Sequence, residues 1–172
     1  EGGIRVPFAV VGPGIEPGSQ SDTPVISYDL LPTLADLAGA GDALAENLDG
    51  GSLRPLFEDS ESEVERSCEG LIFHFPHYNI VGLFEPHSAI RVGDYKLLKF
   101  CSSKRSLLFN VAEDIGESTD LSSKYPERKA ELEVLLADYL ETVKAERPED
   151  SSNWAKGKYG AVKTKFLQRY SD

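Results

Sequence analysis

The pattern of apolar residues over the first forty positions predicts a buried strand followed by a helix. Residues 4–12, IRVPFAVVG, are apolar on both faces, as in a strand of a parallel sheet covered by helices. Pro7 places that strand at an edge or a bulge. Residues 27–41 carry apolar side chains at spacings of three and four, with Pro32 in the first turn and glycines at the end. This predicts a helix with Ser27 as its N-cap. Its apolar face consists of Leu30, Leu31, Leu34, Leu37 and Ala38.

After an acidic stretch the pattern changes to short strands. Apolar, aromatic and β-branched residues recur in four segments, which predict three or four antiparallel strands: 70–78, 87–93, 95–100 and 106–111. Gly93-Asp94 separates the second segment from the third, as in a two-residue hairpin turn. Residues 126–146 predict an amphipathic helix that begins at Pro126.

The order of these elements predicts an α/β fold with three parts. We expect residues 1–57 to form the C-terminal end of an α/β domain, because a strand, a long loop and a helix that covers the sheet make one unit of an α/β layer. We expect residues 58–150 to form a small subdomain of antiparallel strands packed on a helix, and residues 151–172 to form an irregular tail.

Composition and charge narrow the possible partners. The formal net charge of −11 disfavours non-specific nucleic-acid binding, which needs a basic face. No apolar run approaches the ~20 residues that cross a bilayer, so no membrane span is expected. Cys68 and Cys101 lack the spacing of a metal site, and they form either a disulfide or two free thiols.

The beginning of the sequence suggests a piece of a longer protein. The chain contains no methionine, and it enters apolar sequence at residue 4. We therefore expect it to be the C-terminal part of a larger chain, and we draw no expectation about its compartment.

The order of four motifs resembles the C-terminal part of the formylglycine-dependent sulfatases, which have the alkaline-phosphatase-like fold. The first motif is EGGIRVPFAVVGPG at residues 1–14, and the second is VISYDLLPTLADLAG at residues 25–39. The third is LIFHFPHYN together with SAIRVGDYKLLKF, which contains the family's R-x-G-D-x-K-L hairpin. The fourth is LLFNVAEDIGESTDLSSKYPE, with the pattern D-x-x-E before the last helix. The resemblance covers roughly residues 1–150 through the order and spacing of these motifs.

This resemblance implies hydrolysis of sulfate esters of small molecules or glycans by the full-length protein. The family uses formylglycine, made from the Cys or Ser of a Cys/Ser-x-Pro-x-Arg motif, and one divalent cation, usually calcium, held by oxygen ligands. Neither that motif nor the family's Asp-Asn pair occurs in these 172 residues. We therefore expect no cofactor and no catalytic residue in this chain, and no activity from the chain alone.

Three histidines are the candidate substrate-binding residues. His74 and His77 lie in HFPH, after a predicted strand whose following loop reaches the substrate in relatives, and His87 ends the variable stretch after it. Imidazole can donate to a sulfate or to a sugar hydroxyl. The alternative is that these rings pack as aromatic bodies at the edge of the sheet.

Other polar residues have a structural interpretation. We expect Arg5 to be a buried partner of an acid, and Arg91 and Lys96, which flank the hairpin turn, to pair with Asp114 or Glu117. The single tryptophan, Trp154, either covers a seam between the parts of the domain or stacks on a sugar, and we expect the first.

Two further functions stay open at this point. One is a non-catalytic α+β interaction domain with the same hairpin-and-helix layout. The other is a phosphoester or phosphonate hydrolase of the same superfamily. The R-x-G-D-x-K-L hairpin favours the sulfatase, and a Cys/Ser-x-Pro-x-Arg motif before residue 1 would decide for it.

Overall fold

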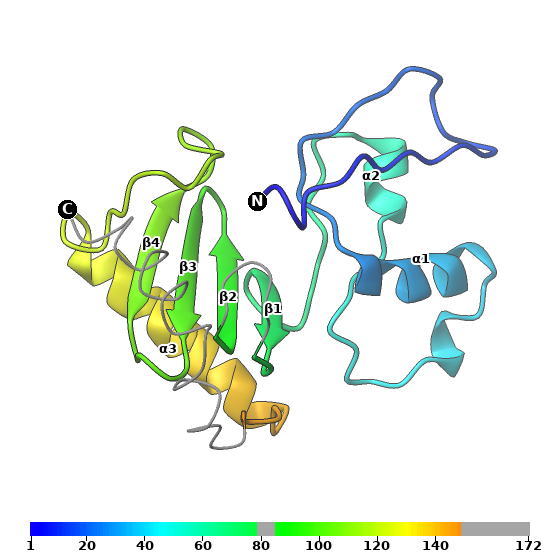
Figure 1. Ribbon diagram of the computed structural model, residues 1–172. Helices are drawn as coiled ribbons and strands as arrows, with labels where there is room; N and C mark the ends of the chain where they lie inside the picture. Colours follow the sequence, from blue (N-terminus) through cyan, green and yellow to red (C-terminus); the bar gives the residue numbers. More distant parts are fainter. Residues whose placement is uncertain (79–84, 149–172) are drawn as a thin grey trace. The chain divides into compact units, whose positions relative to one another are not determined.

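A computed structural model describes residues 1–78 and 85–148 of the chain. The elements, in chain order, are the 3-10 helix η1 (Ser27–Asp29), α1 (Leu30–Leu37), the 3-10 helix η2 (Gly41–Ala43), α2 (Arg54–Glu58), β1 (Leu71–Phe75), β2 (His87–Val92), β3 (Tyr95–Phe100), β4 (Ser106–Asn110) and α3 (Pro126–Thr142) (Figure 1). They belong to two compact units. One unit is Val6–Glu69, and the other joins Glu1–Arg5 to the described residues from Gly70 onward. The predicted boundary between residues 57 and 58 concerns the domains of a longer protein and stays a prediction.

The second unit is a four-stranded antiparallel sheet with a helix on one face. The strands pair in the order β1-β2-β3-β4, and α3 crosses one face of the sheet (Figure 1). All four predicted strands and the predicted C-terminal helix are therefore confirmed. The helix begins at Pro126, where the missing proline N–H removes no helical hydrogen bond.

Both faces of this sheet carry apolar side chains, because alternate residues of a strand project to opposite faces. On the face toward α3, Ile90, Leu97 and Leu108 pack against Leu132 and Leu136 of the helix, and all five side chains are fully buried. The opposite face carries a second buried cluster, which consists of Ala89, Leu98, Phe100, Leu107, Phe109 and Val111.

The turn between β2 and β3 has the predicted length but only one residue with positive φ. Gly93 has φ +57°, whereas Asp94 is not among the residues with positive φ. A type II′ hairpin turn needs a positive φ only at its first central residue. Gly93 alone therefore provides the geometry that this turn requires.

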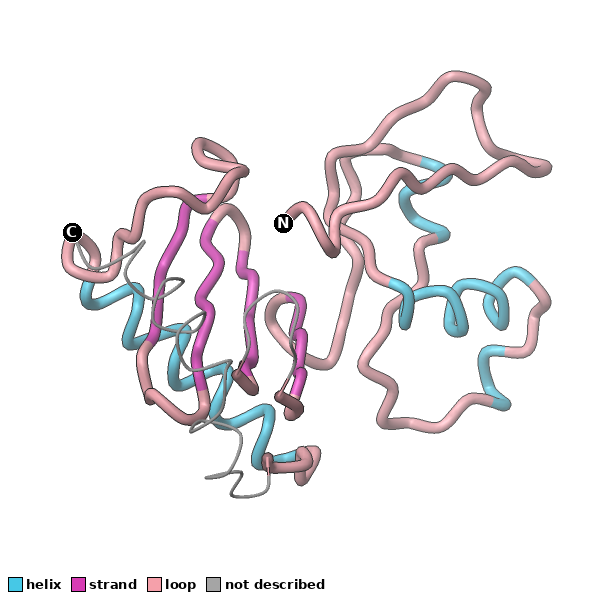
Figure 2. The backbone as a smooth tube through the Cα atoms, viewed as in Figure 1, coloured by secondary structure: helices cyan, strands magenta, loops and turns pink. Residues whose placement is uncertain are grey.

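The first unit contains the predicted helix but not the predicted strand. Residues 6–12 have no regular secondary structure (Figure 2) and no ladder of backbone hydrogen bonds. A strand forms only against a partner, and no described segment of the chain pairs with this one. Its apolar residues are exposed instead, with Val6 at 73% and Phe8 at 51%.

The helix α1 is fixed by its polar residues. The buried carboxylate of Asp29 accepts hydrogen bonds from the backbone N–H groups of Ile26 and Gly51, and from the guanidinium of Arg66 at 2.7 and 2.9 Å. Buried Thr33 donates to the carbonyl of Asp29 and accepts from the N–H of Leu53. The predicted role of Ser27 as N-cap is wrong, because the cap residue of η1 is Ile26 and the carboxylate of Asp29 accepts its N–H.

The apolar face predicted for α1 points away from the core of this unit. Leu30, Leu31, Leu34 and Leu37 are 41 to 63% exposed, whereas Pro32 and Thr33 on the other side of the helix are buried. The described part of this unit therefore has two exposed apolar surfaces, one on α1 and one on residues 6–11.

Candidate functional site

The candidate site lies at the end of the sheet where β1 ends and β2 begins. His87 is directly opposite Phe75 on one neighbouring strand and opposite Phe100 on the other. Directly opposed residues in an antiparallel sheet share a face, so these three rings form one row on the face opposite α3. The ring centroids of His87 lie 5.7 Å from Phe75 and 6.2 Å from Phe100. Phe100 is buried, while Phe75 is 39% exposed.

The hydrogen bonds of His87 fix its neutral tautomer. Its Nδ1 lies 2.8 Å from the backbone carbonyl oxygen of Glu85. A carbonyl oxygen only accepts, so Nδ1 carries the proton and Nε2 keeps its lone pair when the ring is neutral. No group among the described residues bonds to Nε2. This nitrogen can therefore accept from a hydroxyl, or donate to an anion once the ring is protonated.

Glu85 holds the carbonyl that orients His87. Its side chain is 1% exposed, and its Oε1 accepts from both the backbone N–H and the hydroxyl of Ser103 at 3.0 Å. This carboxylate thereby ties the start of β2 to the turn between β3 and β4. Glu85 is not among the residues predicted from the sequence; the available signal was an acid inside the otherwise apolar stretch before His87.

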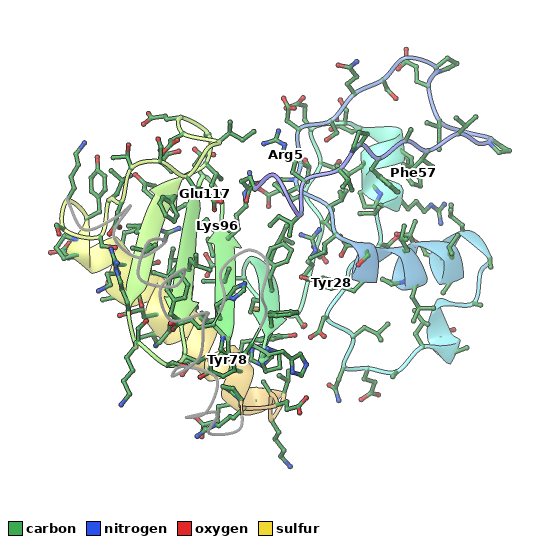
Figure 3. All side chains as sticks on the ribbon, in the orientation of Figure 1. Arg5, Tyr28, Phe57, Tyr78, Lys96 and Glu117 are labelled. Atoms are coloured by element: carbon green, nitrogen blue, oxygen red, sulfur yellow. The ribbon has the colours of Figure 1, made fainter. Side chains whose placement is uncertain are left out.

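His77 lies beside the same row of rings. It is exposed, and it meets Phe75 edge to face with a centroid distance of 5.6 Å. The next residue is Tyr78 (Figure 3). Its hydroxyl lies 2.5 Å from the hydroxyl of Ser102. The structure therefore brings His77 and His87 together around Phe75. An exposed aromatic face with adjacent imidazoles suits a sugar or another partly apolar ligand with polar groups.

His74 does not belong to this group. It is opposite Ser88 in the sheet register, on the face toward α3. Its Nε2 donates to the carbonyl oxygen of Glu146 and its Nδ1 accepts from the hydroxyl of Ser88, both at 2.8 Å. Both nitrogens are thus engaged within the protein, in a contact that holds the segment after α3. Its role in substrate binding stays a prediction, as do those of His77 and His87.

The charged residues near the hairpin turn have the expected partners in part. Lys96 pairs with Glu117 at 2.7 Å, as predicted, and Arg91 lies 3.6 Å from Glu1. The prediction for Arg5 is wrong, because its side chain is exposed. Asp114 instead accepts from the N–H groups of Ser118 and Thr119, which order the loop before α3, and these bonds hold the pKa of its carboxyl below the ordinary value.

The two cysteines are free thiols in separate units. Cys68 and Cys101 are half-buried, and burial is the main cause that raises the pKa of both thiols. The charges of Asp49 and Glu69 raise the pKa of Cys68 further, and the charge of Glu85 does the same for Cys101. A raised pKa lowers the fraction of thiolate, so neither is an activated nucleophile.

The described residues do not fit the divalent cation that the resemblance implies. Across residues 1–78 and 85–148, no three His, Cys, Asp or Glu side chains gather in a way that could hold a metal ion. We therefore derive no chemical step through a metal in this chain. None of the helices in the described part is both long and apolar enough to cross a membrane. Residues 79–84 and Trp154 lie outside the described residues.

Comparison with known proteins identifies relatives along most of the chain. Residues 1–146 match the family model of the N-sulphoglucosamine sulphohydrolase C-terminal domain. A sulfatase of Formosa agariphila is 35% identical over 138 residues, which are 75% of this chain and 25% of the relative. A choline-sulfatase of Rhizobium meliloti is 37% identical over 123 residues, which are 71% and 22%.

A solved structure agrees with these relatives. The structure of a 2-O GAG sulfatase superposes with a TM-score of 0.59 at 30% identity, covering 78% of this chain and 29% of that one. The predicted fold class is confirmed by this likeness. The chain spans only about a quarter of the length of the relatives that it matches.

Proposed function

The chain belongs to the sulfatase family through its N-sulphoglucosamine sulphohydrolase C-terminal domain, and from this premise we propose that it is the C-terminal portion of an enzyme that hydrolyses sulfate esters. The membership confirms the resemblance drawn from the sequence. The observation that carries the proposal is the match over residues 1–146, which spans both structural units. The substrates are sulfated small molecules or glycans, as the names of the choline-sulfatase and of the 2-O GAG sulfatase suggest.

Within such an enzyme this portion completes the core. The exposed apolar surfaces of α1 and of residues 4–11 are the faces that pack against the rest of the protein. Ile4, Val6, Phe8 and Val10 alternate in the sequence, which is the pattern of a strand that buries one face, and they are 38 to 73% exposed. In the relatives, the rest of the protein is about twice the length of this chain, and we infer that it supplies the strands that pair with this segment.

The second contribution is one wall of the substrate pocket. His77 and His87 present imidazole nitrogens beside the exposed ring of Phe75, and these residues are the proposed contacts to the sulfate or to a hydroxyl of the substrate. His74 would contact substrate only after breaking its bond to Ser88 or to Glu146, so the proposal rests mainly on the other two. The nucleophile and the cation come from outside these residues, and the chain alone is inactive.

The sequence that precedes Glu1 in the gene tests the first part of the proposal. We expect a Cys/Ser-x-Pro-x-Arg motif there, together with an Asp-Asn pair. A start codon close ahead of Glu1, with neither motif, would leave the interaction domain as the function of the chain.

Variants of the longer protein test the pocket wall. His87→Gln and His77→Gln are expected to raise KM for a sulfated substrate by about tenfold or more, a loss of roughly 1.4 kcal/mol of binding for a charge-assisted hydrogen bond. The matched control is Lys129→Gln on α3, because this helix packs on the face of the sheet opposite the one that carries His87. Unchanged KM in both histidine variants would remove these side chains from the pocket.

A further inference from the structure

Four charged side chains form a buried cluster on the face of the sheet opposite α3, near the Gly93-Asp94 turn. Lys96 is 6% exposed, and its Nζ lies 3.0 Å from Oε1 of Glu1 and 2.7 Å from Oε1 of Glu117. Arg91 lies opposite Lys96 in the register, and its Nη1 is 3.6 Å from Oε2 of Glu1. Figure 3 shows Lys96 and Glu117 side by side at this end of the sheet.

The cluster satisfies a lysine that would otherwise be costly to bury. A buried ammonium group without partners loses several kcal/mol of hydration. Burial alone would lower the pKa of Lys96, but the hydrogen bonds and charges of Glu117 and Glu1 raise it above the ordinary value. Burial would raise the pKa of Glu117, yet the hydrogen bond and the charge of Lys96 lower it. Lys96 and Glu117 are therefore both charged at neutral pH.

Three segments that are distant in sequence meet at this point. Glu1 opens the chain, Arg91 and Lys96 come from the β2–β3 hairpin, and Glu117 comes from the loop before α3. Glu117 has φ +51°, a conformation that side-chain-bearing residues adopt at a cost of about 1 kcal/mol or more unless their contacts stabilise it. The ion pair with Lys96 provides such a contact.

Residues 1–5 are held to the sheet through Glu1. The carbonyl oxygen of Glu1 accepts from the N–H groups of Ile4 at 3.0 Å and Arg5 at 2.9 Å, which closes a tight turn. This turn belongs to the compact unit of the sheet, whereas the chain from Val6 to Glu69 belongs to the other unit. The side chain of Glu1 is 4% exposed, so its pairing with Lys96 is an anchor rather than a surface contact.

We propose that Lys96 is a positioning residue that anchors residues 1–5, and through them the stretch of the longer protein before them, to the sheet. Lys96 acts through Glu1. It holds the carboxylates of Glu1 and Glu117 beside the hairpin, and it thereby orients the segment that leads into residue 1. The backbone nitrogen of Glu1 lies 2.6 Å from Oε2 of Glu117. An amide nitrogen carries an N–H donor as well, so this position keeps a donor when a residue precedes Glu1. The inference rests on the proposed function, in which the larger portion of the enzyme comes before Glu1.

Hydrogen exchange of the 172-residue chain tests the anchor directly. In Lys96→Met, which keeps the length of the side chain without its charge, we expect the amides of Ile4 and Arg5 to exchange several-fold faster. Strand amides of Leu97 and Leu98 keep their protection. Lys96→Arg retains the cation and is expected to restore most of the protection, and Lys99→Met, on the same strand but outside the cluster, is expected to leave it unchanged. Equal acceleration in the strand and in residues 4–5, or no change in Lys96→Met, overturns the anchor.

The longer protein provides the second readout. Lys96→Met is expected to lower kcat at least tenfold with KM nearly unchanged, while Lys99→Met has no effect on either. Loss of expression with no local effect on exchange would mean that Lys96 only stabilises the fold. If the unaltered longer protein hydrolyses no sulfate ester, the proposed function fails, and hydrogen exchange alone then decides whether Lys96 anchors Glu1.

Discussion

The interaction of Asp29 with Arg66 is the contact whose loss should most destabilise the unit Val6–Glu69. The carboxylate of Asp29 is fully buried and the side chain of Arg66 is 11% exposed. Asp29→Asn keeps one oxygen for a backbone N–H but removes the charge, and its amide hydrogens face the guanidinium of Arg66. Breaking a buried ion pair from one side costs about 3–5 kcal/mol, because the remaining charge is left without a partner. We expect Asp29→Asn to lower the free energy of unfolding of this unit by this amount, which is enough to unfold a marginally stable unit.

Hydrogen exchange with peptide resolution measures this effect in each unit separately. Peptides that cover α1 are expected to lose protection, while peptides from β3 serve as the internal reference in the same sample. The double variant Asp29→Asn with Arg66→Met removes both charges, and it should be less destabilised than the sum of the two single variants by at least about 1 kcal/mol. Additive single effects, or a loss of less than about 1 kcal/mol in Asp29→Asn, would refute the assignment of this pair as the anchor of α1.

Three other predictions concern stability. In Gly51→Ala a Cβ would lie 2.0 Å from the carbonyl oxygen of Glu65, so urea unfolding should show a loss of at least about 2 kcal/mol, whereas Gly41→Ala, with nothing within 4 Å, should be neutral. Thr33→Val leaves the N–H of Leu53 without its acceptor and should cost about 1–3 kcal/mol in the same assay, and an unchanged midpoint would contradict the role of this hydroxyl. Because the pKa of Glu117 is lowered in the folded chain, its contribution to stability is complete above pH 4.5, the ordinary pKa of the group, and is lost as the pH falls through its pKa in the folded chain. The difference in stability between the unaltered chain and Glu117→Gln should therefore shrink in acid. A difference that stays constant with pH would contradict the pairing with Lys96.

The sequence predicts the sheet unit well because its signals are local. Alternation, turn residues and the helical period of residues 126–146 act within one element, and the four strands and α3 appear where these patterns place them. The pairing of Lys96 with Glu117 also follows from residues that flank a recognisable turn. Its extension to Glu1 could not be predicted, because no local pattern connects residue 1 to residue 96.

The strand predicted at residues 4–12 shows where local reasoning fails. An apolar run predicts a buried strand only if other strands and helices are present to cover it, and the described residues contain no partner. The same holds for the exposed leucines of α1. The histidines show a second limit: the spacing in HFPH places His74 and His77 close in sequence, but alternation along β1 directs His74 toward α3, away from His87.

The most direct test of the central claim is hydrolysis by the full-length product of the gene that encodes this chain. Sulfate release from an aryl sulfate, choline sulfate and a sulfated glucosamine is measured beside phosphate release from the matching aryl phosphate, with the 172-residue chain as a second sample. We predict sulfate release from at least one ester, with kcat/KM well above that for the phosphate, and no turnover by the 172 residues alone. Faster release of phosphate than of sulfate, or turnover by the short chain itself, would contradict the account.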